Sequence, residues 1–392
     1  MKPLYIFQSC LLTILLPLAT FAGEQIQPIP TGVWKEHGLT EVQRNSIREA
    51  FQKGVDEKMI PGGAMVLIHR GENIFEEAFG LANLETKKPF TVNTPCRIAS
   101  LTKPHTSTMI SLLADQGKLS LNDRVDKYIP EFKEFEVQGK DSLVKAPTLA
   151  QCLSHTAGFG SNNELKAGQF TVNLNGQLED VMADLATKKL MTEPGTKYAY
   201  SRLGYMTAGR VAEIVTGKSY QEVMEEVLFK PIGARDSTFD LTDELSQKMA
   251  TPYEKTKKGL IERTGLGMGT AINPGGNLIT TLDGVSRLFM LHRNRGKVDG
   301  QRIISEETLK KMYILQPGSE GSGMGYGLGF RILQKRPDGT ANRIQHTGAS
   351  GTIGIIDFDL DLIVIILTQV PQAQTNNWRR PLLQTTFNIF QE

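Results

Sequence analysis

Apolar residues recur every three or four positions in the first clearly patterned stretch of the chain, residues 40–58. Four of them form an approximate stripe along one side of a helix: Val42, Ile47, Phe51 and Val55. Thr40 is available to cap the first turn. The stretch AMVLIHRGENIFEEAFG at residues 64–80 then gives two apolar runs separated by the turn residues 70–73. We therefore expect a helix followed by a β-hairpin.

From Ser100 onward the pattern becomes helical and loop-rich, with frequent proline and glycine. The stretch SYQEVMEEVLF at 219–229 predicts a helix with one apolar face, formed by Tyr220, Val223, Met224, Val227 and Leu228. A second helix is predicted over TTLDGVSRLFMLH at 280–292, with Thr280 and Asp283 as its capping box. We interpret both apolar stripes as core positions.

Strand patterns return near the end of the chain. YGLGFRILQ at 326–334 and NRIQHTG at 342–348 each predict a strand, and residues 351–369 predict a hairpin that turns near 359–361. A last helix over residues 377–390 can cover the resulting sheet.

This order of elements predicts an α+β fold. An antiparallel sheet, flanked by the N- and C-terminal helices, would be formed by residues 23–110 and 286–392. A mainly helical domain, residues 111–285, would be inserted between these two parts. We expect the active site in the cleft where the two units meet.

The first residues resemble a secretory signal peptide. MKPLYIFQSCLLTILLPLATFAGEQ contains a lysine, an apolar stretch through Leu18, and small residues before a possible cleavage site after Ala22. The apolar run is short and no basic flank follows it. We expect cleavage of residues 1–22, a periplasmic or secreted protein and no stable membrane span afterwards; an uncleaved anchor is the alternative.

Composition and charge exclude few functions. The chain has 392 residues, 40% of them hydrophobic, which is enough for a large core. The net charge of +2 is spread without long basic runs, so no nucleic-acid partner is expected. The histidines show no H-x-H or H-E-x-x-H spacing, so we expect no metal. Cys96 and Cys152 lie in apolar contexts, where a disulfide and two buried free thiols both stay open.

The stretch RIASLTKPHT at 97–106 carries the candidate chemistry. Ser100 and Lys103 are three residues apart, a spacing that places both side chains on one helix face. A partly desolvated lysine there can take the proton of the serine hydroxyl. In the alternative interpretation, Ser100 caps the helix and Lys103 is a solvated surface charge.

Two further motifs follow in a fixed order. Y-S-R stands at 200–202 and H-T-G at 346–348, with LSHTAGF at 153–159 and YGLGF at 326–330 between or beside them. Together with S-x-x-K, and with EPGTKYAYS and GGNLITTLDGVSRL, this set resembles the serine beta-lactamase and penicillin-binding protein superfamily. The resemblance is to its class C beta-lactamase, DD-peptidase and esterase branch, and implies a beta-lactamase/transpeptidase-like fold.

The resemblance also implies roles for site residues. Ser100 would be the nucleophile that forms an acyl-enzyme, and Lys103 and Tyr200 would share general-base and general-acid duty, in an order that the sequence leaves open. The backbone N–H groups of Ser100 and Ala349 would bind the oxyanion. Gly348 would allow the substrate close to the strand, and Thr347 would offer its hydroxyl.

Two positions depart from the pattern of the family. Arg202 stands where many relatives have asparagine, and it can repel Lys103 or reach a substrate carboxylate. His346 stands where beta-lactamases usually have lysine, so a positive charge there is not assured. His155 and His105 are interpreted as structural. Ester or D-peptide hydrolysis is therefore expected above efficient beta-lactam hydrolysis.

The sequence as a whole predicts an exported serine hydrolase that needs no metal or organic cofactor. Its substrate would be a small molecule or a peptidoglycan-derived compound, with an ester, a D-amino-acid peptide bond or a beta-lactam ring as the reacting group. The alternative is a catalytically silent protein of the same fold that binds penicillin or cell-wall peptides.

Overall fold

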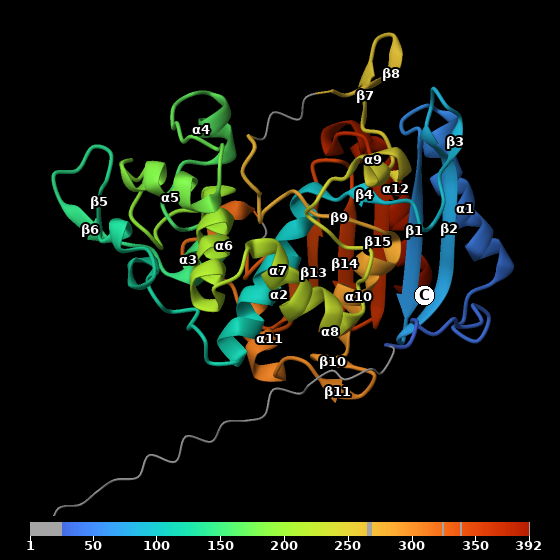
Figure 1. The fold of residues 1–392 in the computed structure, drawn as a ribbon. Helices are drawn as coiled ribbons and strands as arrows, with labels where there is room; N and C mark the ends of the chain where they lie inside the picture. Colours follow the sequence, from blue (N-terminus) through green and yellow to red (C-terminus); the bar gives the residue numbers. More distant parts are fainter. Residues whose placement is uncertain (1–25, 265–268, 324, 338, 392) are drawn as a thin grey trace, which may run out of the picture.

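Seven antiparallel strands from the two ends of the chain form the central sheet (Figure 1). The computed structural model describes residues 26–264, 269–323, 325–337 and 339–391, and the predicted signal peptide lies outside them. The strand order is β12-β13-β14-β15-β1-β2-β3. These strands are β1 Gly62–His69, β2 Glu72–Asn83, β3 Lys88–Pro89, β12 Arg331–Lys335, β13 Ala341–Thr347, β14 Ile353–Asp357 and β15 Leu362–Thr368.

Strands β1 and β15 lie side by side at the centre of the sheet and join the N-terminal part of the chain to the C-terminal part. Every residue of both strands is buried. Successive side chains point to opposite faces, so Met65 and Leu67 pack in one core while Ala64 and Val66 pack in the other. A strand buried on both faces reads as a continuous apolar run, as these do.

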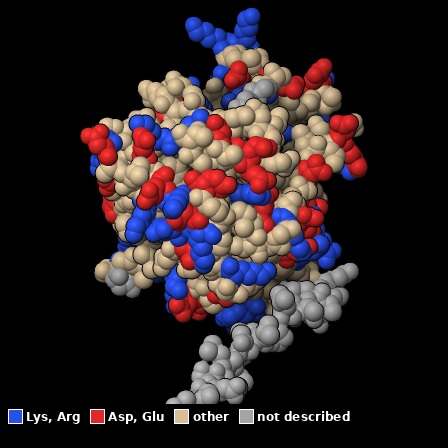
Figure 2. All heavy atoms as spheres, turned by 60° about the vertical axis from the view of Figure 1, so that its left-hand side comes forward, with Lys and Arg blue, Asp and Glu red and all other residues tan. Residues whose placement is uncertain are grey.

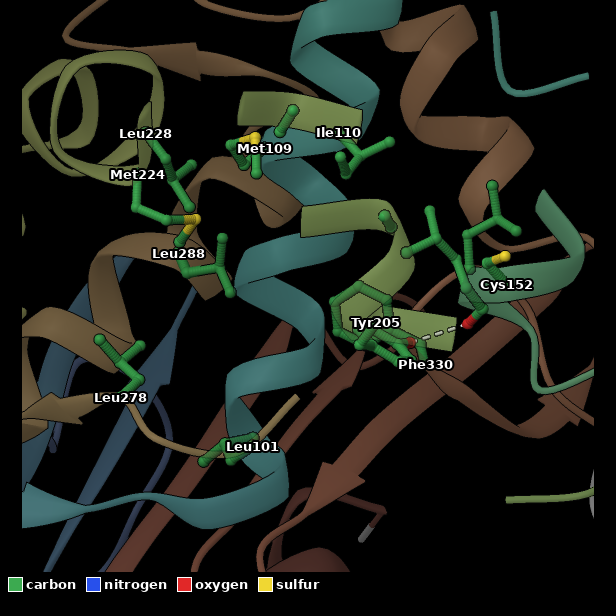
Figure 3. Packing of buried hydrophobic residues seen from close by; sticks show 14 of the residues in the cluster. Leu101, Met109, Ile110, Cys152, Tyr205, Met224, Leu228, Leu278, Leu288 and Phe330 are labelled. Carbon is green, nitrogen blue, oxygen red and sulfur yellow. Dashed lines mark hydrogen bonds between the residues drawn. The ribbon is translucent and has the colours of Figure 1, made fainter. Parts of the chain in front are cut away.

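Helices cover both faces. Helices α1 (Glu41–Asp56) and α12 (Gln372–Gln391) pack together on one face, where the indole N–H of Trp378 donates to the Ala50 carbonyl at 2.9 Å. Helices α2 (Thr102–Asp115) and α10 (Leu282–Arg293) contribute to the core on the other face. Figure 3 shows α2 running through this second core, with labelled apolar side chains around it.

The remaining helices lie mainly beside the sheet, on the left and lower side of Figure 1. The α-helices are α3 Leu149–Leu153, α4 Asn162–Lys166, α5 Leu178–Ala186, α6 Leu203–Thr216, α7 Tyr220–Met224, α8 Lys230–Ile232, α9 Asp243–Lys248 and α11 Glu306–Met312. The short 3-10 or π turns are η1 Ala99–Leu101, η2 Val125–Lys127, η3 Pro130–Phe132, η4 Glu225–Phe229 and η5 Glu320–Ser322.

Four small two-stranded ribbons complete the secondary structure of the described residues. They pair β4 (Cys96–Arg97) with β9 (Ile279–Thr280), β5 (Glu134–Glu136) with β6 (Leu143–Lys145), β7 (Tyr253–Thr256) with β8 (Gly259–Glu262), and β10 (Lys297–Val298) with β11 (Gln301–Arg302). The β4–β9 ribbon directly precedes the turn that carries Ser100, so it anchors that turn.

The predicted α+β class, the first helix and both hairpins are confirmed. Thr40 caps α1 in a capping box with Gln43. The turn between β1 and β2 has Arg70 and Gly71 at φ of 54° and 87°, the left-handed pair that a tight hairpin turn requires. The late hairpin turns between Asp357 and Leu362, as expected.

Three local predictions are wrong in detail. The cap of α10 is Thr281, whose hydroxyl accepts from the Gly284 N–H, while Thr280 lies in β9. The helix that starts at Tyr220 changes to a π turn after Met224, although its apolar face is buried as predicted. The strand expected from Tyr326 begins only at β12, because its first residues form an irregular segment.

Both cysteines of the described chain, Cys96 and Cys152, are free and buried. Burial raises the pKa of each thiol, so neither is a ready nucleophile. No helix among the described residues has the length and apolar composition that crossing a membrane would require. Figure 2 shows basic and acidic side chains interspersed over the face it presents. The division into 23–110, 111–285 and 286–392 stays a prediction.

Candidate active site

Ser100 lies in η1, a 3-10 helix one turn long that directly precedes α2. The residue before it, Ala99, has a φ of 47°, a left-handed conformation that costs a non-glycine residue about 1–2 kcal/mol. The hydroxyl of Thr102 donates to the Ala99 carbonyl at 2.6 Å and holds the turn. The strained turn leaves the Ser100 side chain partly exposed, while the helix that follows it is buried.

Lys103 lies in the first turn of α2 and points at Ser100. Its Nζ donates to Ser100 Oγ at 3.2 Å and to the Gly275 carbonyl at 2.7 Å. Only 1% of the residue is exposed. The interpretation of Lys103 as a solvated surface charge is therefore wrong, and the predicted meeting of the two side chains is observed.

The surroundings of Lys103 disfavour its charged form. The Nζ lies 4.8 Å from the ring centre of Tyr200 and 5.2 Å from that of Tyr205, and no carboxylate among the described residues forms an ion pair with it. Burial, with a smaller contribution from the Arg202 charge, lowers the pKa of Lys103 to about 7. A substantial fraction of this lysine is therefore neutral near pH 7 and able to accept a proton.

Tyr200 comes from the irregular segment before α6. Burial raises the pKa of the Tyr200 phenol, and hydrogen bonding with Ser100 only partly offsets this effect. The ring of His155 packs on it with 4.3 Å between ring centres, and His155 Nδ1 accepts the backbone N–H of Ser201 at 3.1 Å. Tyr200 is thus a neutral phenol near pH 7, packed against the His155 ring.

Two backbone N–H groups beside Ser100 lack an acceptor. Neither the N–H of Ser100 nor that of Ala349 donates a hydrogen bond within the described part of the chain. Ala349 is exposed and Ser100 is half-buried, so both donors are open to a molecule that approaches the nucleophile, as an oxyanion site requires. Both residues lie where the resemblance predicts these donors.

The H-T-G end of β13 is tied to the serine turn. Thr352 Oγ1 donates to the Ile98 carbonyl at 2.9 Å, and Ser350 Oγ donates to the Arg97 carbonyl at 2.8 Å. A Cβ at Gly348 would collide with Thr352 Oγ1 and the Ile98 carbonyl. The space beside Gly348 is thus filled by the protein itself, and the glycine is needed for this close approach of β13 to the turn. Thr347 is half-buried at the end of β13.

His346 points into the protein, in contact with Tyr326. Its Nδ1 lies 2.8 Å from the Thr347 carbonyl and must donate to it, so Nε2 accepts the Tyr326 hydroxyl at 2.8 Å. Burial, the Lys103 charge and Arg331 lower the pKa of His346 well below its usual value. This position therefore carries no positive charge near neutral pH.

Arg202 stands at the start of α6 on the other side of Lys103. Its backbone N–H donates to Asn162 Oδ1 at 3.0 Å, and its guanidinium Nε lies 3.5 Å from the same oxygen. It forms no ion pair with a described residue, and its charge contributes to the lowered pKa of Lys103. The positive charge of Arg202 therefore disfavours the charged form of Lys103, and a contact between Arg202 and a substrate carboxylate stays a prediction.

Ser100 and Ala349 both line two cavities, which differ in their other lining residues. The larger, of about 830 Å³, also includes Lys103 and Arg202. The smaller, of about 450 Å³, includes Tyr200, His346 and Thr347. The two parts of a substrate on either side of a carbonyl at Ser100 could therefore each occupy one cavity.

Several contacts at the site were missed by the sequence-based reasoning. The Gly275 carbonyl, the Tyr205 ring, the Asn162 amide and the Tyr326 hydroxyl each contact a predicted site residue. Gly275 and Tyr326 lie in motifs that the resemblance already singled out, so the signal was present without the role. His105 is buried and its Nδ1 donates to the Leu101 carbonyl at 3.0 Å, a structural role as expected. The described residues contain no cluster of three or more potential metal ligands.

Comparison with known proteins places these features in context. A family model described as Beta-lactamase matches residues 47–384. Protein flp of Staphylococcus aureus strain MW2 is 28% identical over 216 residues, and the chain spans only 42% of the length of this relative. The uncharacterized protein MT1414 of Mycobacterium tuberculosis is 27% identical over 361 residues, which cover 83% of this chain and 88% of that protein.

Solved structures share the fold at low sequence identity. EstCE1, a hydrolase with promiscuous acyltransferase activity, is similar with a TM-score of 0.76 and 22% identity, over 88% of this chain and 98% of that one. A simvastatin synthase variant from Aspergillus terreus is similar with a TM-score of 0.74 and 21% identity, over 90% of this chain and 99% of that one. The octameric penicillin-binding protein homologue of Pyrococcus abyssi is similar with a TM-score of 0.70 and 24% identity, over 88% of this chain and 78% of that one. The predicted beta-lactamase/transpeptidase-like fold is thereby confirmed.

Proposed function

We propose that this chain, which belongs to the beta-lactamase family, is a serine hydrolase that acts through an acyl-enzyme on Ser100. The observation that carries the proposal is the contact between Lys103 Nζ and Ser100 Oγ at 3.2 Å, with the lysine buried and its pKa lowered to about 7. A serine hydroxyl becomes a nucleophile when a neighbour takes its proton. Lys103 lies in position to take that proton, and its lowered pKa leaves a fraction of the amine neutral and able to accept it near pH 7.

In the acylation step, Ser100 Oγ attacks the substrate carbonyl carbon while neutral Lys103 accepts the hydroxyl proton. The Ser100 and Ala349 N–H groups donate to the developing oxyanion. When the tetrahedral intermediate collapses, the bond to the leaving group breaks and the Tyr200 phenol gives it a proton. The Lys103 ammonium then returns a proton to Tyr200, which leaves both groups neutral.

In the deacylation step, a water molecule attacks the acyl carbon and gives a proton to the same basic system. The ester bond to Ser100 breaks, the serine recovers its proton from Lys103, and the acid product leaves. The high pKa of Tyr200 favours the phenol as acid, and the low pKa of Lys103 favours the amine as base. On this basis we propose Lys103 as the base and Tyr200 as the acid.

For the substrate, we propose an ester or a D-amino-acid peptide ahead of a beta-lactam. The reason is His346, which is neutral and bound to Tyr326 at the position where beta-lactamases present a lysine charge. A neutral imidazole attracts the carboxylate of a penicillin-like compound less strongly than an ammonium does.

A side-by-side assay tests this ranking. The purified protein without residues 1–22 is offered 4-nitrophenyl butyrate and a chromogenic cephalosporin, and we expect kcat/KM for the ester to be higher by about ten-fold or more, a difference of about 1.4 kcal/mol in transition-state binding. A higher value for the cephalosporin would reverse the ranking. Inertness on both, and on a D-alanyl-D-alanine peptide, would contradict the hydrolase itself.

Export and the domain division belong to the same proposal. We propose that residues 1–22 act as a signal peptide and that the enzyme works in the periplasm or outside the cell. We also propose that the part formed by 23–110 and 286–392 and the part formed by 111–285 enclose the site. In support, Ser100 precedes α2, Tyr200 and Arg202 precede and begin α6, and Ala349 follows β13.

The alternative function is a catalytically silent binder of penicillin or cell-wall peptides. Arg202 is the feature that favours it, because its charge lies close to Lys103. Two observations weigh against it: the lysine is held on the serine hydroxyl, and two backbone donors stand unpaired beside it. A binder needs neither.

A further inference from the structure

The larger cavity beside Ser100 has a strongly basic lining. Besides Lys103, four cationic side chains contribute to it: Arg97, Lys166, Arg202 and Arg263. They come from four separate segments of the chain, namely β4, α4, the start of α6 and the residue after β8. A basic lining assembled from distant segments concentrates positive potential in this cavity, whereas the face shown in Figure 2 mixes side chains of both signs.

These four cations have no partner of opposite charge within the described part of the chain. None of them forms an ion pair, although Arg202 contacts the neutral Asn162 side chain. The one carboxylate that the described residues add to the lining is Glu262, which is exposed and likewise unpaired. Glu262 offsets at most one of these positive charges, so the described residues do not neutralise the basic lining.

Burial makes this arrangement costly. Arg97, Arg202 and Arg263 are only partly exposed, and burial lowers the pKa of both the Arg97 and the Arg202 guanidinium. A desolvated guanidinium without a carboxylate loses hydration and gains no counter-charge. An anion that enters the cavity would supply the missing counter-charge and form charge-assisted hydrogen bonds.

We propose that the larger cavity receives an acyl group that carries a carboxylate. This inference rests on the proposed function, because it assigns the two cavities to the two parts of a substrate. Tyr200, the acid that protonates the leaving group, lines the smaller cavity and not the larger. The leaving group therefore lies on the Tyr200 side, and the acyl chain extends past Lys103 and Arg202.

The size and chemistry of the cavity fit such a group. A volume of about 830 Å³ is within the range of small-molecule sites and exceeds the needs of a short neutral acyl chain. A guanidinium presents parallel N–H donors that match a carboxylate. The preferred substrates would thus be monoesters or monoamides of dicarboxylic acids, or peptides with an acidic side chain on the acyl side.

The smaller cavity also contains arginines, and the test must exclude their effect. Arg331, Arg379 and Arg380 line it, and Arg379 donates to the Gly351 carbonyl at 2.9 Å. These residues lie on the leaving-group side. A probe series with one constant neutral leaving group and variable acyl charge reports on the larger cavity alone.

The experiment uses three 4-nitrophenyl esters with six-carbon acyl chains. The adipate monoester is anionic, the hexanoate is neutral, and the 6-aminohexanoate is cationic. We expect kcat/KM to fall in that order, with about ten-fold or more between adipate and hexanoate, the usual effect of one good charge-assisted contact. We also expect the adipate preference to shrink as NaCl rises from 20 mM to 500 mM, since salt screens partly exposed charges.

Variants locate the effect. Arg97→Gln and Arg263→Gln should each lower the ratio of kcat/KM for adipate over hexanoate by about three-fold to ten-fold. The matched control is Arg70→Gln, which removes an exposed arginine in the turn between β1 and β2, outside both cavities. This control should leave the ratio unchanged. The use of a ratio cancels any general effect of a variant on folding or on Ser100.

The outcomes separate this inference from the proposed function. Hydrolysis of hexanoate with no preference for adipate, or a preference that survives in both cavity variants, would overturn the inference and leave the hydrolase intact. If none of the esters is turned over by the wild type, the proposed function fails and this inference falls with it.

Discussion

Replacement of Lys103 by methionine is expected to lower kcat/KM by about 10³-fold while making the folded protein more stable at pH 7. Activity is lost because the Ser100 hydroxyl no longer has a base at 3.2 Å. Methionine has a similar length and an apolar side chain, so it can fill the same buried space. The two effects have opposite signs, which a simple folding defect cannot produce.

The stability gain follows from proton binding. Burial lowers the pKa of Lys103 from 10.5 to about 7, so between these pH values the unfolded chain binds a proton that the folded chain does not. Folding stability of the wild type therefore rises with pH through this window and is lowest below it. At pH 7 the cost is roughly 4–5 kcal/mol, at about 1.4 kcal/mol per pKa unit.

Methionine removes that cost but also removes a donor. The Gly275 carbonyl, which accepts from Lys103 Nζ at 2.7 Å, is left without this partner, at about 1–3 kcal/mol. The net gain is thus about 2 kcal/mol at pH 7. It should turn into a loss of about 1 kcal/mol at pH 10, where most of the proton-binding cost is gone and the lost hydrogen bond remains. Urea unfolding at both pH values measures it.

An exposed lysine supplies the control for this experiment. Lys118→Met, at an exposed position three residues after α2, should leave activity and stability at pH 7 nearly unchanged. A Lys103→Met protein that keeps its activity would refute the role of the lysine as base. A loss of stability of equal size at pH 7 and pH 10 would refute the buried, largely neutral amine.

Replacement of Tyr200 by phenylalanine is expected to have an effect that depends on the leaving group. For an alkyl ester or a D-peptide, whose leaving group needs a proton, kcat/KM should fall by about 10²- to 10⁴-fold. For a 4-nitrophenyl ester, whose leaving group is stable as an anion, the loss should be less than about ten-fold. Burial, which raises the pKa of Tyr200 and keeps it a neutral phenol, is the reason for this assignment.

The neighbouring tyrosine offers a matched control. The Tyr198 hydroxyl is buried and has no hydrogen-bond partner among the described residues, and Tyr198 lines neither cavity. Tyr198→Phe should therefore change both activities by less than about two-fold and cost no stability. Equal losses for the two leaving groups in Tyr200→Phe would show that Tyr200 positions other groups and donates no proton.

The elements that the sequence predicts well are those with strong local patterns. Residues 41–56 carry an apolar stripe and a capping threonine, and residues 62–83 carry apolar runs that a tight turn separates; both stretches fold as expected. The errors lie where tertiary contacts override the local pattern. Tyr326 reads as the start of a strand, but its hydroxyl binds His346 in the core, and the strand begins only at β12.

At the site, too, local patterns predict some features, and tertiary contacts determine the rest. The spacing of Ser100 and Lys103 shows that they can meet, and the ordered motifs indicate Tyr200 and Ala349 as their neighbours. Burial of the lysine, and with it the choice between base and acid, depends on Gly275 and Tyr205, which are distant in sequence. No local pattern reports that environment.

The basic lining of the larger cavity is invisible in the sequence for a related reason. The net charge of +2 is small and evenly spread, and no run of basic residues marks the site. Arg97 and Arg263 become neighbours of one cavity only because the chain returns from β8 and β9 to the turn before Ser100. A charge pattern of this kind is a property of the fold.

Covalent labelling tests directly whether Ser100 is an activated nucleophile. The wild type and Ser100→Ala are each incubated with a serine-directed 4-nitrophenyl alkylphosphonate and analysed by intact-protein and peptide mass spectrometry. We predict one phosphonyl adduct on the wild type, located on the peptide that contains Ser100, and none on Ser100→Ala. An unlabelled wild type, or a label that persists in Ser100→Ala, would contradict the account and favour the silent binder.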